Sequence, residues 1–72
     1  MDRRIYWSDF DSNAAEWVVR DLFTGKAIYR SRDLNDVEVW GKTHAQTFGK
    51  TFFLIGFNHE LLAIYDDGER IR

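Results

Sequence analysis

One stretch of the chain, residues 33–49, carries apolar side chains at the spacing of a helix. The stripe recurs every three or four residues, which places its members on one face: Leu34, Val37, Trp40, His44 and Phe48. Asp33 or Asn35 can cap the N-terminus of this helix. Gly41 would cost about 1 kcal/mol relative to alanine inside a helix, so a strand over "VEVW" remains an alternative.

The segments on either side of this helix are typical of strands. Residues 3–10 are aromatic and β-branched, which predicts a first strand. Residues 16–31 favour a hairpin with Gly25 in the left-handed region at the end of a three-residue loop, although residues 14–24 could instead form a helix. Residues 50–65 predict a second hairpin that turns at Asn58-His59.

These elements predict an α+β fold. Their order is β-β-β-α-β-β, with a sixth short strand possible after "DDG". We expect a small antiparallel sheet of about five strands, with one helix packed on one of its faces. The length of 72 residues and the lack of linker-like stretches indicate one compact domain over residues 1–72.

Composition restricts how this domain is stabilised and where it acts. The chain has no cysteine, so its small core depends on twelve aromatic residues instead of disulfides. The longest apolar run is too short to span a bilayer, and the N-terminus does not resemble a signal peptide, so we expect a cytoplasmic protein. The net charge of −2 is not typical of a nucleic-acid-binding module.

Three features resemble parts of known functional sites, but none of them is complete. Gly-Lys-Thr occurs twice, at residues 41–43 and 49–51, but neither copy has the first glycine of a P-loop. Residues 9–13 begin like a calcium loop but lack its glycine and glutamate. The two histidines are expected on different elements, and no catalytic set is evident. We therefore expect no enzyme activity, no cofactor and no metal site.

Alternation along the first hairpin predicts a basic surface. If Leu22 pairs with Lys26, then Trp17, Val19, Ala27 and Tyr29 share one face. The opposite face carries aliphatic residues between three basic ones, Arg20, Lys26 and Arg30. Either this is a solvated face whose arginines cover apolar neighbours, or it is a contact surface for an acidic partner.

The stretch Glu16–His44 also resembles the module of three strands and a helix at the N-terminus of tyrosine recombinases. The matching features are "WVVR", "TGK", "YRS" and Trp40 on the helix. In that family a small antiparallel sheet lies in the DNA major groove. The resemblance implies a DNA-binding role for Arg20, Lys26 and Arg30.

The second hairpin is apolar on both faces. With a turn at Asn58-His59, one face carries Phe53, Ile55, Phe57, Leu62 and Ile64, and the other carries Phe52, Leu54, Leu61, Ala63 and Tyr65. One helix covers only one face of a sheet. The surplus apolar face predicts an interface with another protein or with a second copy of the chain.

Two functional hypotheses follow. The first is a non-enzymatic protein-binding module that occupies a partner surface as an inhibitor, adaptor or assembly subunit, by analogy with phage-encoded inhibitors. Its predicted contact residues are Arg20, Lys26, Arg30, Phe53, Ile55, Phe57 and Leu62. The alternative is a DNA-binding module that uses the basic sheet face.

Overall fold

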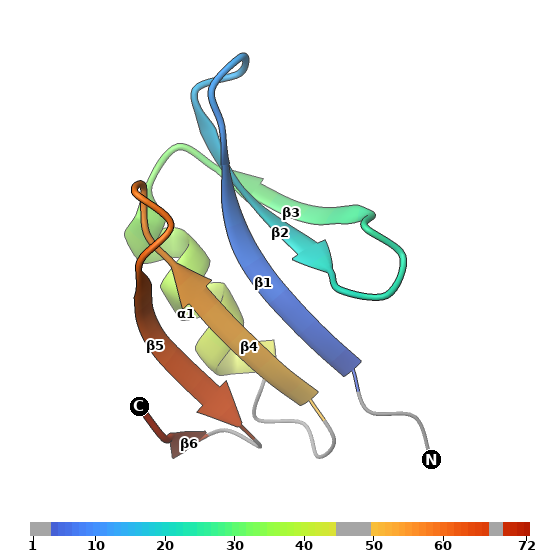
Figure 1. The fold of residues 1–72 in the computed structure, drawn as a ribbon, viewed down its shortest axis with the longest axis vertical. Coiled ribbons are helices and arrows are strands. Elements are labelled where there is room, and N and C mark those ends of the chain that lie inside the picture. Colours follow the sequence, from blue (N-terminus) through green and yellow to red (C-terminus); the bar gives the residue numbers. More distant parts are fainter. Residues whose placement is uncertain (1–3, 45–49, 67–68) are drawn as a thin grey trace.

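The computed structural model describes residues 4–44, 50–66 and 69–72. Within these residues the chain forms six strands and one helix: β1 (Arg4–Asp11), β2 (Glu16–Asp21), β3 (Ala27–Ser31), α1 (Leu34–His44), β4 (Lys50–Ile55), β5 (Leu61–Asp66) and β6 (Glu69–Arg70). All six strands belong to one sheet, and α1 lies against one of its faces (Figure 1). The α+β class and the order of elements agree with the prediction. Phe48 and Gly49, at the predicted end of the helix, lie outside the described residues.

The prediction of a purely antiparallel sheet is wrong. The strand order is β3-β2-β1-β4-β5-β6, and the central pair, β1 and β4, is parallel. The helix explains this pairing, because α1 carries the chain from the end of edge strand β3 back across the sheet to the start of β4. A strand that follows such a crossover runs parallel to the strand before it. β3 therefore runs in the same direction as β1 and β4.

The start of α1 is fixed by Asp33. Its side chain accepts a hydrogen bond from the backbone N–H of Asn35 at 2.9 Å, which is the geometry of an N-cap. Its backbone carbonyl accepts hydrogen bonds from the N–H groups of Asp36 and Val37. Of the two predicted caps, Asp33 is the one used, and the strand alternative for "VEVW" is wrong.

The β2–β3 hairpin has the predicted register at its base and a different register near its tip. The base pairs are Trp17 with Ser31, Val18 with Arg30, and Val19 with Tyr29. An irregularity after Val19 then pairs Arg20 with Ala27, so Ala27 does not join the face predicted for it. Gly25 has the expected positive φ, 71°, but the loop is one residue longer than predicted, because the N–H of Asp21 bonds to the carbonyl of Lys26.

The β4–β5 hairpin also has the predicted register at its base and a shifted register near its loop. Pairs from Thr51–Asp66 to Leu54–Ala63 follow the predicted register, but the next pair is Ile55 with Leu61. The loop is closed by a hydrogen bond from the N–H of Gly56 to the carbonyl of Glu60, and His59 takes the positive φ, 63°. The predicted two-residue turn at Asn58-His59 is therefore wrong. The loop has three residues, and Leu62 is the extra residue of the bulge that follows.

The hydrophobic core lies between α1 and one face of the sheet. Its buried members alternate along the three strands β2, β4 and β5 and include one helical residue: Trp17, Val19, Val37, Phe52, Leu54, Ala63 and Tyr65. Trp40 extends this core with ring contacts to Tyr6, Tyr29 and Phe52. We call this side of the sheet the covered face.

Gly41 has a packing role that the sequence did not reveal. It is buried on α1, and a Cβ placed there would lie 2.1 Å from a ring atom of Phe52. Only glycine lets the helix backbone approach this ring. The helix-propensity cost at position 41 is therefore offset by close packing on the largest fully buried side chain of the core.

Candidate functional site: the open face of the sheet

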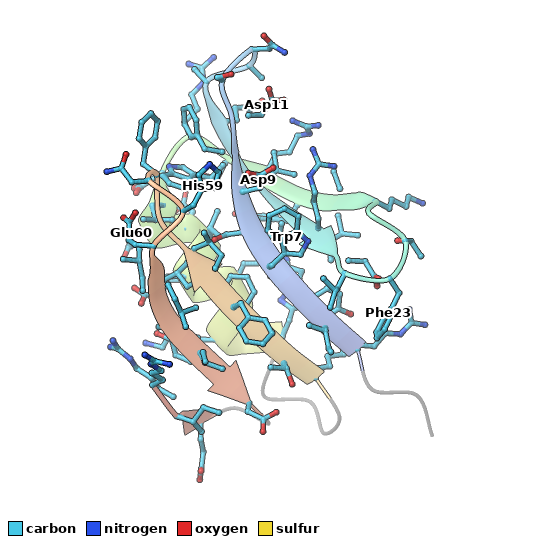
Figure 2. The ribbon with its side chains drawn as sticks, viewed as in Figure 1. Trp7, Asp9, Asp11, Phe23, His59 and Glu60 are labelled. Carbon is cyan, nitrogen blue, oxygen red and sulfur yellow. The ribbon has the colours of Figure 1, made fainter. Side chains whose placement is uncertain are left out.

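The face of the sheet opposite α1 carries a second set of side chains. Figure 2 shows Trp7 and Asp9 on β1 in front of the sheet, with α1 behind it. Strand alternation and the register of the ladders place ten further side chains with them on this side: Ile5, Asp11, Val18, Arg20, Arg30, Thr51, Phe53, Ile55, Ile64 and Asp66. We call these twelve residues the open face.

Trp7 and Phe53 form the centre of the open face. They are partners across the parallel β1–β4 pair, and two strands lie on each side of that pair. Their row continues to Arg20 on one side and to Ile64 on the other. Both aromatic side chains are half-buried, unlike Phe52 on the covered face, which is fully buried. A row of large side chains thus lies partly open to solvent at the middle of the sheet.

The parallel pair splits just beyond this centre, and Ser8 stabilises the point of separation. The Ser8 hydroxyl donates to the carbonyl of Ile55 at 2.8 Å and accepts from the N–H of the same residue. The last partners of the β1–β4 ladder are Trp7 and Phe53, so the ladder does not pair the backbone of Ile55. Ser8 satisfies the N–H and the carbonyl of Ile55 instead, which holds the two central strands together beneath the open face.

The arginines predicted to make a basic surface are paired with acids. Arg20 Nε lies 3.7 Å from an Asp9 carboxylate oxygen, and Arg30 Nη1 lies 3.3 Å from one of Asp11. Both aspartates come from β1, which lies next to β2. The surface is therefore neutralised rather than basic. Sequence reasoning missed these partners because it did not assign β1 a register beside β2, although Asp9 and Asp11 alternate in step with Trp7.

The side chains of these ion pairs lie around a buried valine, Val18. It lies on the open face between Asp9 and Arg30 in the ladders, yet it is fully buried. The aliphatic parts of long charged side chains commonly cover apolar neighbours in this way. The β1–β3 part of the open face is thus polar at its surface and apolar beneath it.

Asp11 is also the residue that orders the β1–β2 turn. Its Oδ1 accepts hydrogen bonds from the N–H groups of Asn13 and Ala14, while Oδ2 faces Arg30. The bond from Ala14 and then the one from Arg30 lower the pKa of the Asp11 carboxyl below its usual value. The carboxylate is thus held ionised by a turn and an ion pair, which accounts for the calcium-like spacing at residues 9–13.

Of the seven predicted contact residues, four share the open face: Arg20, Arg30, Phe53 and Ile55. Lys26 is exposed and lies just before β3, where the hairpin loop ends. Phe57 is exposed at the β4–β5 loop, where its ring contacts Phe10 at 4.9 Å between centroids. Phe10 in turn packs against the core of the covered face, so Phe57 does not join Phe53 and Ile55.

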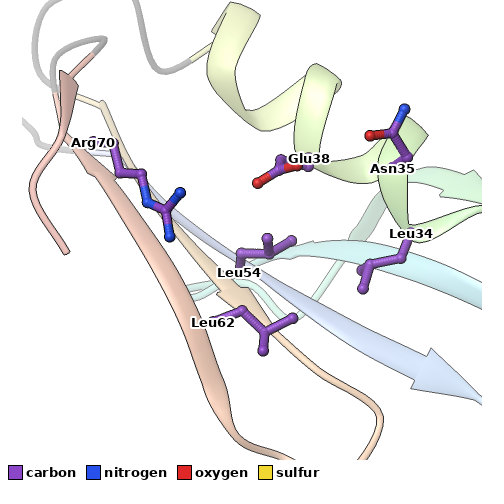
Figure 3. A pocket seen from close by; sticks show the side chains of 6 residues that line it. All are labelled: Leu34, Asn35, Glu38, Leu54, Leu62 and Arg70. Carbon is purple, nitrogen blue, oxygen red and sulfur yellow. The ribbon is translucent and has the colours of Figure 1, made fainter.

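Leu62 also lies elsewhere, because the bulge in β5 turns it toward the helix side. There it lines a shallow pocket of about 320 Å³ between α1 and the strands β5 and β6, shown in Figure 3, with Leu34, Asn35, Glu38, Leu54 and Arg70. The volume is at the lower end of the range for ligand sites. On this side Glu38 accepts a hydrogen bond from the Tyr65 hydroxyl at 2.9 Å.

The histidines do not form a reactive centre in the described part of the chain. His44 stacks on Trp40 at 4.0 Å between centroids, and its Nδ1 lies 2.8 Å from the Trp40 carbonyl oxygen. His59 lies in the β4–β5 loop, where its backbone takes the positive φ. No group of three or more potential metal ligands occurs within residues 4–44, 50–66 and 69–72.

Searches with protein-family models, curated proteins and solved structures give no match to this chain. The stretch that resembles the tyrosine recombinase module, residues 16–44, contains two strands and the helix rather than three strands and a helix. Within the described residues, no helix has the length and apolar character needed to cross a membrane.

Proposed function

We propose that this chain is a small, non-enzymatic, cytoplasmic module that binds another protein through the open face. It would act by occupying a partner surface, as an inhibitor, adaptor or assembly subunit. The observation that supports this most directly is the Trp7–Phe53 pair at the centre of a sheet face that α1 does not cover.

The distribution of side chains around this pair resembles the anatomy of a protein interface. Interface energy is concentrated in a few central residues, most often Trp, Tyr and Arg, with polar groups at the rim. Here Trp7, Phe53 and Ile64 form an apolar row, and Arg20 joins it at one end. The alternative of DNA binding has less support, because Arg20 and Arg30 already pair with aspartates.

A comparison of two surface aromatics tests the proposal. Trp7 lies on the open face, while Phe23 is 69% exposed at the β2–β3 loop, away from the centre of the sheet (Figure 2). Immobilised wild type, Trp7→Ser and Phe23→Ser would be used to capture partners from a lysate, after circular dichroism confirms that each is folded. We expect Phe23→Ser to retain the captured proteins and Trp7→Ser to lose them by at least tenfold.

Equal capture by wild type and Trp7→Ser would contradict the proposed surface. Loss with Phe23→Ser and retention with Trp7→Ser would place the contact at the β2–β3 loop instead.

A further inference from the structure

We propose that the partner of the open face is a second copy of this chain, packed face to face so that two sheets enclose a common apolar layer. This inference rests on the proposed function, because it requires the open face to be a binding surface. It adds the identity of the partner and a specific geometry.

The size of the sheet suits such a dimer. The two longer dimensions of the molecule are 35 and 24 Å. A face of this size offers on the order of 800 Å², which is the area that each partner contributes to an interface of standard size. A sheet packed on another sheet at the usual spacing of about 10 Å would cover the half-buried side chains of both copies.

The charge of the open face favours a copy of itself over a strongly charged partner. Arg20 and Arg30 balance Asp9 and Asp11 on its polar part. The chain as a whole carries a formal charge of only −2, so two copies repel each other weakly. With Asp66 included, the open face has three aspartates and two arginines, so a highly charged partner of either sign would find little opposite net charge here. In such a dimer an arginine of one copy can also pair with an aspartate of the other, since each face carries both positive and negative side chains.

The position of the aromatic pair points to the same arrangement. Trp7 and Phe53 flank the middle of the strand order, with three strands on each side. In a two-fold dimer, a symmetry axis that passes near the middle of a face brings the same residues of both copies together. Trp7 and Phe53 of one copy would therefore meet those of the other, at the centre of the interface where hot spots gather.

Sedimentation equilibrium from low micromolar to near-millimolar concentration tests this proposal. We expect wild type to change from monomer to dimer across this range. Trp7→Ser and Phe53→Ser should weaken the dimer at least tenfold in dissociation constant. Phe57→Ser serves as the control, because Phe57 is 60% exposed but does not lie on the open face, and it should dimerise like wild type.

A second measurement avoids reliance on variants that fail to fold. Acrylamide quenching of tryptophan fluorescence in wild type should decrease as the concentration rises, because dimerisation would cover Trp7. The conservative Trp7→Phe variant should lose this concentration dependence, since Trp17 and Trp40 pack with the core of the covered face.

Two results would overturn the proposal. One is a wild type that stays monomeric, with constant quenching, at the highest concentration. The other is a dimer that persists unchanged in both open-face variants. If the chain is monomeric but still captures a different protein in a Trp7-dependent way, the proposed function stands and only the identity of the partner is wrong.

Discussion

Phe52 and Phe53 are neighbours in β4, yet they lie in different environments. Phe52 points to the covered face, where it is fully buried and contacts Trp40 and Tyr65. Phe53 points to the open face, where it is half-buried beside Trp7. Two identical side chains, one residue apart, thus have different roles. The covered face holds the hydrophobic core, and the centre of the open face leaves large apolar side chains partly exposed.

The largest expected difference between the faces concerns these two phenylalanines. Phe52→Ala should lower the free energy of unfolding by about 3–5 kcal/mol, because it removes the largest fully buried side chain and leaves a cavity. Phe53→Ala should cost only about 1 kcal/mol, because its side chain is half-exposed in the monomer. Urea unfolding at a concentration low enough to keep the protein monomeric measures both values. Equal losses would mean that the open face is packed as tightly as the covered face.

A smaller effect is expected at Gly41, where the helix meets the covered face. Gly41→Ala places a methyl group against the Phe52 ring, and such overpacking costs roughly 1–3 kcal/mol, offset by up to about 1 kcal/mol of helix propensity. We expect a net loss of stability. Thr43→Ala, at an exposed position of the same helix, should be neutral or slightly stabilising.

A double-mutant cycle tests the physical reason for the effect at Gly41. If the clash with the ring is the cause, Gly41→Ala should cost less in a Phe52→Leu background than in wild type. Equal costs in both backgrounds would mean that the Phe52 ring is not the obstacle.

The smallest expected effect concerns Tyr65 at the margin of the covered face. Burial, and then the hydrogen bond to Glu38, raise the pKa of the Tyr65 hydroxyl above its ordinary value of 10.0. Above pH 10 the unfolded state loses this proton while the folded state keeps it, so stability falls as the pH rises. Tyr65→Phe should remove this contribution and cost about 1 kcal/mol at neutral pH through the lost hydrogen bond.

Urea midpoints at pH 8 and pH 11 for wild type and Tyr65→Phe measure the alkaline effect, because the difference between the two proteins isolates this residue. A variant that loses as much stability as wild type between these pH values would contradict the assignment.

Local patterns in the sequence were sufficient to predict much of the covered face. The apolar stripe from Leu34 to Trp40 predicted the helix, and alternation predicted that Trp17 shares a face with Val19 and Phe52 with Tyr65, as they do in the core. These predictions were correct because the side-chain period belongs to each helix or strand by itself, and burial of one face is enough to make that period visible in the sequence. The bases of both hairpins kept the predicted register for the same reason.

Both hairpin tips departed from prediction, and the cause lies in backbone geometry. Each hairpin has an irregularity in its register near the loop, which shifts the pairing by one residue. The alternation of side chains in the rest of each strand is the same whichever residues close the turn, provided that a bulge restores the register. Alternation therefore does not reveal where the turn closes. This shift moved Phe57 and Leu62 away from the face on which alternation had placed them.

The sequence by itself thus determined the elements, their order and most of the side chains that share a face. Tertiary structure alone decided the parallel pairing of β1 with β4, and this pairing created the candidate site. It placed Trp7 beside Phe53, while the antiparallel pairing of β1 with β2 put Asp9 and Asp11 next to Arg20 and Arg30. These contacts join residues more than ten positions apart. The Trp7–Phe53 contact depends on which strands become neighbours when the helix crosses the sheet, and the ion pairs depend on β1 lying beside β2. No local periodicity records either choice.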